Sequence, residues 1–497
     1  MRRDSLPYRH LINCTGILVV FYLLGVTVFG NSENKLLFQA QESPNRSRPP
    51  ELGPAPSLKL PQIHIRTLLN GLQIRIVETH EVPLVQINVL VTTGSGDEPA
   101  SQMGIANLTA AMLDEGAGNR SALEISDAVE FLGAMLQTRS SFDASSVQLN
   151  VPTARLTEAL PILADVVLRP TFPKQELDRL KNLRLTALLQ ARDNAGAIAT
   201  AAFNRTLFGR RHRYGTGTTG TETSLEALTV KNLREFHASH YLPSTSTIIV
   251  VGDVSPDTIL PQLAHSFGAW KSKARVRTVP SKRRALSERE VVLVDKPGAA
   301  QSQIRIGWVG VPRSTSDYFT LEVLNTVLGG SFTSRLNLNL RETHGYTYGA
   351  WSTFEMRLGP GPFIAGASVQ TDKTAEALQE FFLELDAIRQ PIGLKELAKA
   401  KNYLSLGFPK RFETIANTSR RVEELIIYSL PEDYFQDYML RVQEVTADAV
   451  NKASLQYMSP LHSAVVIVGD LKIIEPKIRA LKLGSIRHMS LDEAFGH

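Results

Sequence analysis

The chain has 497 residues, of which 43% are hydrophobic and 21% charged, and it carries a formal net charge of +5. This length corresponds to roughly two to four domains. Its only cysteine is Cys14, which excludes an intramolecular disulfide. The densest basic run, 271–290, contains no aromatic residue, so the composition argues against a nucleic-acid-binding protein.

The N-terminal region has the pattern of an export signal. A basic start, MRRDSLPYRH, precedes an apolar run at 16–30. About fifteen apolar residues after positive charges are typical of a signal peptide and are short for a membrane span. We therefore predict a signal peptide or an uncleaved anchor over 1–30 and a flexible Pro/Ser-rich tether over 31–58. The protein is expected to be exported and periplasmic, and to touch a membrane only if this segment stays uncleaved.

Several elements can be predicted in chain order beyond the tether. Apolar strands are expected at 72–78 and 85–92, and we expect them to form a hairpin or to lie side by side. Leucines at helical spacing predict helices over 175–192 and 376–388. A further helix is expected over 229–241, with Thr229 as its N-cap.

Two segments show that the chain contains an internal repeat. HYLPSTSTIIVVGDV at 240–254 returns as QYMSPLHSAVVIVGDL at 456–471. In each, an aromatic residue precedes a proline-bearing turn, and a strand of β-branched residues ends in Gly-Asp. Gly252 and Gly469 are 217 residues apart.

The repeat predicts two similar halves and therefore a fold class. We expect an N-terminal half at 59–272, a basic linker at 273–287 and a C-terminal half at 288–480. Strands and long helices alternate irregularly in each half. This is typical of an α+β fold with a mostly antiparallel sheet and helices on one face.

Five stretches resemble the insulinase/pitrilysin family of zinc peptidases, which includes mitochondrial processing peptidase. The resemblance covers about 59–475 and implies that the two homologous halves form half of a clam-shell. The stretches are LLNGLQIRIVE (68–78), GIANLTAAMLDEGAGNRS (104–121), RHRYGTGTTGTETSLEAL (211–228), FHASHYLPSTSTIIVVGDV (236–254) and LGGSFTSRLNLNLRETHGYTYG (328–349).

The family's zinc motif is absent from the matching helix. The motif is His-x-x-Glu-His, in which two histidines share the metal and the glutamate acts as general base. The resemblance places the histidines at Asn107 and Ala111 and the base at Ala110. The third ligand, a glutamate, falls near Ala187–Leu188, and no glutamate occurs at 177–221. Alanine neither binds zinc nor accepts a proton, so we expect no metal on this chain and no activity from it alone.

Other histidines offer a weaker metal hypothesis. His237 and His240 are three residues apart and can share a helical face, but no base lies between them. A helix that leads into the turn before a core strand is the favoured interpretation.

The second half keeps a different part of the family's chemistry. Arg341 and Tyr348 are seven residues apart, with Gly345 between them. The resemblance implies that this pair binds a substrate carbonyl near the metal and steadies the oxyanion. Both side chains are donors, which suits that role. Tyr346 would point to the opposite face of an extended strand and is the weaker candidate.

These observations favour a non-catalytic, substrate-binding subunit of a heterodimeric zinc metalloendopeptidase. Its partner would carry the His-x-x-Glu-His motif and the zinc, and the complex would bind extended peptide by adding a strand to a sheet edge. Two alternatives stay open. One is a peptidase-like assembly or peptide-binding protein with no hydrolytic role. The other is a metal-independent or differently metallated hydrolase, which would need a ligand cluster that the sequence does not reveal.

Overall fold

The computed structural model describes residues 46–47, 60–271 and 286–496. The predicted export segment, 1–30, lies outside the described residues, as do most of the predicted tether and linker. The described residues from 60 onward belong to one compact unit. Within the described ranges, none of the helices has the length and apolar character needed to cross a bilayer.

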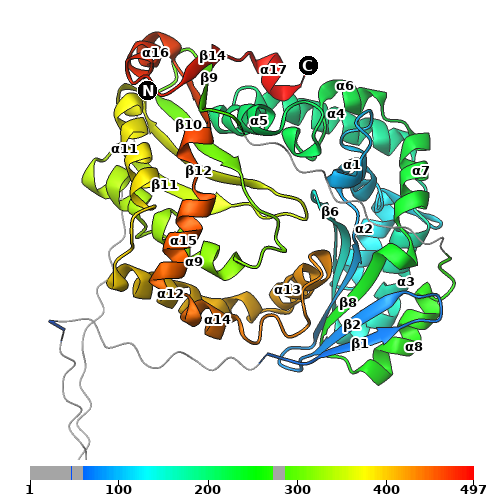
Figure 1. Cartoon of the computed structure of the whole chain (residues 1–497). Helices are drawn as coiled ribbons and strands as arrows, with labels where there is room; N and C mark the ends of the chain where they lie inside the picture. Colours follow the sequence, from blue (N-terminus) through cyan, green and yellow to red (C-terminus); the bar gives the residue numbers. More distant parts are fainter. Residues whose placement is uncertain (1–45, 48–59, 272–285, 497) are drawn as a thin grey trace, which may run out of the picture. The chain divides into compact units, whose positions relative to one another are not determined.

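The first half is built on a six-stranded sheet in the order β1-β2-β8-β3-β7-β6 (Figure 1). All of its strand pairs are antiparallel except β2 with β8. The expected pairing of β2 with β3 is wrong, because β8 lies between them. All seven residues of β8 are buried, as a central strand requires. The strands are β1 Ile63–Thr67, β2 Gln73–Glu78, β3 Leu84–Val91, β6 Met135–Ser140, β7 Ser145–Pro152 and β8 Ser246–Gly252.

The second half repeats this architecture in the order β14-β9-β13-β10-β12-β11. β13 pairs in parallel with β9 as β8 does with β2, and Gly469 ends β13 as Gly252 ends β8. The edge strands differ, because β14 runs parallel to β9 and lies beyond residue 480. The strands are β9 Glu290–Asp295, β10 Gln301–Val309, β11 Thr347–Phe354, β12 Pro362–Gln370, β13 Ala464–Gly469 and β14 Ser485–His488.

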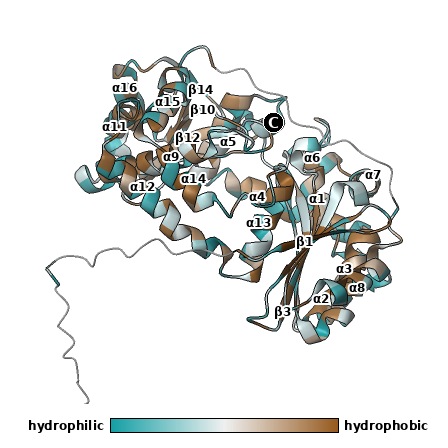
Figure 2. Cartoon of the chain, turned by 60° about the horizontal axis from the view of Figure 1, so that its bottom comes forward, coloured by the Kyte–Doolittle hydropathy of each residue, from teal (hydrophilic) through white to brown (hydrophobic). Residues whose placement is uncertain are grey.

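Each sheet packs one face against helices of its own half, and the two largest hydrophobic cores lie there. Figure 2 shows the first sheet as a brown, hydrophobic band beside α2, α3 and α8. The helices of the first half are α1 Ile105–Ala111, α2 Ala122–Phe131, α3 Leu156–Leu168, α4 Lys174–Ala191, α5 Ala195–Phe208, α6 Glu222–Ala227, α7 Val230–His240 and α8 Pro256–Phe267. The predicted helices at 175–192 and 229–241 are therefore α4 and α7, and the Thr229 side chain caps α7 by accepting from the Asn232 amide.

The helices of the second half include the predicted helix 376–388, which is α11. They are α9 Tyr318–Leu328, α10 Arg335–Asn337, α11 Thr374–Ala387, α12 Leu394–Gly407, α13 Ile415–Ile427, α14 Tyr438–Glu444, α15 Ala447–Tyr457, α16 Leu471–Ala480 and α17 Leu491–Phe495. A single π-helical turn, Leu338–Thr343, follows α10 directly.

The opposite face of each sheet is covered by a helix from the other half (Figure 1). α5 of the first half packs on the second sheet, and α13 of the second half packs on the first. In β8, Ile248 and Val250 face the helices of their own half, whereas Ile249 and Val251 pack with Val422 of α13. This alternation follows the period of two along a strand. The exchange was not anticipated from the sequence.

Polar contacts also join the halves. The Glu423 carboxylate of α13 accepts from the amide nitrogens of Asn88, at 2.7 Å, and Gln148, at 3.3 Å. The Tyr428 hydroxyl donates to Asp143 at 3.2 Å. The two sheets therefore belong to one interlocked structure.

Candidate functional site

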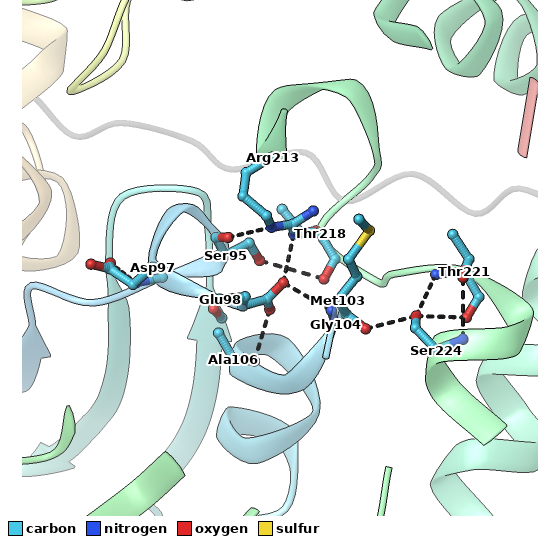
Figure 3. Close-up of polar contacts among 12 residues, drawn as sticks. Ser95, Asp97, Glu98, Met103, Gly104, Ala106, Arg213, Thr218, Thr221 and Ser224 are labelled. Carbon is cyan, nitrogen blue, oxygen red and sulfur yellow. Dashed lines mark hydrogen bonds and ion pairs between the residues drawn. The ribbon is translucent and has the colours of Figure 1, made fainter. Parts of the chain in front are cut away.

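The N-terminus of α1 is fixed by a buried carboxylate, that of Glu98 (Figure 3). It accepts from the backbone amides of Gly104 and Ala106, both at 2.9 Å. The Arg213 guanidinium pairs with the same carboxylate at 2.5 Å and also donates to the Ser95 carbonyl. Burial raises the pKa of Glu98, and the charge of Arg213 opposes that shift. The backbone amides at a helix N-terminus have no partner within the helix, and the helix dipole is positive there, so both stabilise a nearby carboxylate.

The loop that follows Arg213 packs directly on the start of α1. Gly104 and Gly220 both have positive φ, at 91° and 87°. A Cβ on Gly104 would lie 2.2 Å from the Thr219 carbonyl oxygen, and one on Gly220 would lie 2.3 Å from the Met103 carbonyl oxygen. Only glycine combines this conformation with this close approach. The Ser224 hydroxyl adds a bond to the Met103 carbonyl (Figure 3).

The residues at the expected ligand positions do not fit zinc. Ala110 is buried, and Ala111 and Leu188 pack against the hydrophobic core of the first half. Asn107 offers only an amide, which is a poor zinc ligand by itself, because zinc sites in proteins use Cys, His, Asp and Glu. Across the described residues, no group of three or more such side chains is placed to hold a metal ion.

A buried cation lies beside this helix instead. Arg184 of α4 donates to the Asn107 carbonyl at 3.2 Å, and its other terminal nitrogen, Nη1, is buried without a hydrogen-bond partner. Burial lowers the pKa of Arg184 to about 10. A second cation at this position would meet repulsion. An arginine in a polar helix is usually solvated, so this burial could not be predicted from the sequence.

The two histidines of α7 belong to the packing of the first half. His237 lies 2.9 Å from the Val167 carbonyl through Nε2 and stacks on Tyr241 with ring centroids 4.8 Å apart. Burial lowers the pKa of His237, which favours its neutral form. His240 lies 2.8 Å from the Phe236 carbonyl through Nδ1. These contacts agree with the interpretation that α7 is a packed helix that leads into the turn before a core strand.

In the second half, Arg341 and Tyr348 lie together. The guanidinium carbon of Arg341 is 5.0 Å from the centroid of the Tyr348 ring and 4.5 Å from that of Phe332. Tyr348 is 86% exposed and Phe332 is 63% exposed, so the cluster faces solvent. Phe332, in the loop between α9 and α10, was not singled out from the sequence, although it belongs to the LGGSFTSRL run.

Backbone irregularities position both members of the pair. Arg341 lies in the π-helical turn, and Tyr348 lies where the register of β11 against β12 shifts, between Thr347 and Ala350. π-turns and β-bulges redirect side chains and are frequent at functional sites. Tyr346, by contrast, is partly buried, packs against the core and stacks on His344. This agrees with its weaker candidacy.

Comparisons with known proteins agree across both halves. Residues 74–215 match a family model described as "Insulinase (Peptidase family M16)", and residues 227–404 match one described as "Peptidase M16 inactive domain". A zinc protease of Mycobacterium leprae is 25% identical over 407 residues, 81% of this chain and 91% of that protein. The zinc protease YmxG of Bacillus subtilis is 28% identical over 342 residues, 68% and 81% of the two chains.

Solved structures show the same fold. A peptidase M16 inactive domain from Pseudomonas fluorescens superposes with a TM-score of 0.77 at 26% identity, covering 82% of this chain and 98% of that one. The first half of the periplasmic protease PqqL from Escherichia coli gives a TM-score of 0.71 at 18% identity, covering 89% and 98%.

Proposed function

Because this chain belongs to the insulinase family of peptidases, we propose that it is the non-catalytic, substrate-binding subunit of a heterodimeric zinc metalloendopeptidase. The observation that carries the proposal is an asymmetry between the halves. The first half has no zinc ligands on α1, whereas the second holds Arg341 and Tyr348 together at the surface. Zinc and the general base would come from a partner with a His-x-x-Glu-His helix.

The pair would act on the peptide at the partner's metal. A guanidinium and a phenol hydroxyl both donate hydrogen bonds, and donors aimed at a developing oxyanion stabilise the transition state. β11 is the edge strand of its sheet, where an extended peptide can add a strand, although the amides of Ala350 and Ser352 already donate to Asn337 and to the Gly329 carbonyl. Tyr348 lies on that strand, which would bring a bound peptide close to both donors.

We also propose export to the periplasm. The basis is the basic start and apolar run of the first 30 residues, which match the signal-peptide pattern. Protease protection of the chain in spheroplasts, compared with osmotically shocked cells, tests this placement. A chain found only in the cytosolic fraction would contradict it.

The function is tested by mixing the purified mature chain with a His-x-x-Glu-His partner from the same organism. We expect no turnover of an unstructured peptide by this chain alone and turnover on mixing. Tyr348→Phe and Arg341→Ala should each lower kcat by a factor on the order of 10², while gel filtration shows an unchanged complex. Tyr346→Phe and Arg479→Ala, a partly buried tyrosine and an exposed arginine of α16, serve as matched controls.

Two outcomes count against the proposal. Full turnover by a complex that carries both Arg341→Ala and Tyr348→Phe would remove the substrate-binding role and favour an assembly protein. Zinc-dependent turnover by this chain alone would contradict the assignment of the ligand positions.

A further inference from the structure

A cavity of about 500 Å³ lies between the two halves, beside the position of the missing third zinc ligand. Volumes of this order are typical of ligand pockets. The first half contributes Leu188 of α4, one side of α5 and the glycine- and threonine-rich loop 215–220, and the second half contributes Arg305 of β10 and the end of α17. The cavity is therefore complete only when both halves are folded together.

Two arginines line this cavity, and among its described lining residues none is Asp or Glu. Arg205 of α5 is only 6% exposed, and its Nε is buried without a hydrogen-bond partner. The hydroxyl of Thr216, also 6% exposed, has no partner either. Arg305 lies over the Trp351 ring at 5.4 Å and donates to the Ile304 carbonyl at 2.9 Å. Buried donors without partners are rare in folded proteins and call for an acceptor.

The charge balance indicates what kind of acceptor would fit. Burial lowers the pKa of both Arg205 and Arg305, so neither charge is well compensated. The charge of Arg210 adds to the shift of Arg205, and Glu493 of α17, which opposes it, is itself hydrogen-bonded to Arg487. The described lining of the cavity therefore carries positive charge and no acidic side chain, which suits an anionic group such as a carboxylate.

We propose that this cavity binds one carboxylate of an extended peptide, supplied by its C-terminus or by an Asp or Glu side chain. Arg305 and Arg205 supply the opposite charge, and the Thr216 hydroxyl supplies a neutral donor. Leu188 and Phe495 give apolar contact for the rest of the residue. That the carboxylate belongs to a peptide rests on the proposed function, but the site itself lies on this chain alone.

The cavity is held in shape before a ligand arrives. Loop 215–220 follows Arg213, whose bonds to Glu98 and Ser95 fix it against the start of α1. The same network therefore positions the helix that lost its zinc ligands and the loop that lines the carboxylate site. Pre-organised donors bind with less loss of conformational freedom.

The test uses the purified chain without a partner and four fluorescent versions of one unstructured peptide. The peptide carries one internal Glu and a free C-terminus; the others have an amidated C-terminus, Glu→Gln, or both changes. Anisotropy should show at least about 10-fold weaker binding of the doubly neutral peptide, since charge-assisted hydrogen bonds are the stronger kind. The single change that accounts for the loss identifies the source of the carboxylate.

Variants of the chain complete the test. Arg305→Gln should bind the acidic peptides more weakly and discriminate less between the four, since only Arg205 remains, whereas Arg479→Gln, at an exposed position, should bind as wild type. Thr216→Val keeps the shape of the side chain and should weaken the acidic peptides a few-fold. Thermal unfolding checks that each variant is folded.

Three results would overturn the inference: no peptide binding, equal binding of all four peptides by the wild type, or unchanged discrimination by Arg305→Gln. The proposed function fails separately, through turnover that does not depend on Arg341 and Tyr348. Discrimination between the peptides combined with such turnover would keep the carboxylate site and remove the peptidase role.

Discussion

Arg184 is a charged side chain that the fold buries with the Asn107 carbonyl as its hydrogen-bond partner, and replacing it should change the stability of the protein. The fall of its pKa to about 10 corresponds to about 3 kcal/mol against the charged form. Because the folded-state pKa lies below the unfolded one, this destabilisation is present at every pH below about 10 and is relieved above it. The bond to the Asn107 carbonyl returns about 1 kcal/mol. Arg184→Met should therefore raise the free energy of unfolding at pH 7 by about 1 to 2 kcal/mol.

Urea denaturation followed by circular dichroism measures the change. Arg179→Met is the matched control, because Arg179 lies on the same helix but is exposed and pairs with Glu115 and Glu176. Exposed ion pairs contribute about 0 to 1 kcal/mol, so this variant should be neutral or slightly less stable. A loss of more than about 1 kcal/mol in Arg184→Met would refute the reasoning, since charge-assisted hydrogen bonds of that strength would mean that the guanidinium is well partnered.

The remaining predictions concern metal, packing and pH. The triple substitution Asn107→His, Ala110→Glu, Ala111→His should bind no stoichiometric zinc in elemental analysis after dialysis, because the third ligand is missing and Arg184 lies alongside. Glu98→Gln leaves a buried guanidinium without its carboxylate and should lower the free energy of unfolding by about 3 kcal/mol in urea. Burial raises the pKa of Glu423, so the unfolding free energy should fall as pH rises from about 4.5 through that raised value, and Glu423→Gln should remove this part of the pH dependence.

Each of these predictions has a contrary result. One zinc per chain in the triple variant would show that Arg184 does not block the site. Glu98→Gln with wild-type stability would show that the α1 amides and Arg213 find other partners. A pH profile that is unchanged in Glu423→Gln would assign the dependence to other carboxyls.

Much of the fold could be predicted from local patterns. The offset of 217 residues between Gly252 and Gly469 predicts two equivalent strands, and β8 and β13 are equivalent in both sheets. The family resemblance paired Arg341 with Tyr348, and the structure brings their side chains within contact distance. Thr229 could be predicted as a cap because the capping preference is local.

Contacts between elements far apart in the sequence could not be predicted from local patterns. The strands 72–78 and 85–92 are close in sequence, which favoured direct pairing, but β8 inserts between them from more than 150 residues away. The pattern of α13 predicts one apolar face but does not say which sheet that face covers. Arg184 and Arg205 lie on helices whose sequences do not distinguish a solvated arginine from a buried one.

The exchange of α5 and α13 between the sheets has a consequence for how the chain reaches its native state. The first sheet exposes Val77, Leu90, Ile249 and Val251 until α13 covers them, and α13 begins at residue 415. During synthesis this half stays incomplete while more than 140 further residues emerge, a period in which it offers a hydrophobic surface to chaperones or to aggregation. The two halves should thus fold in one cooperative step, and a chain truncated before residue 415 should be insoluble although its own sheet is intact in sequence.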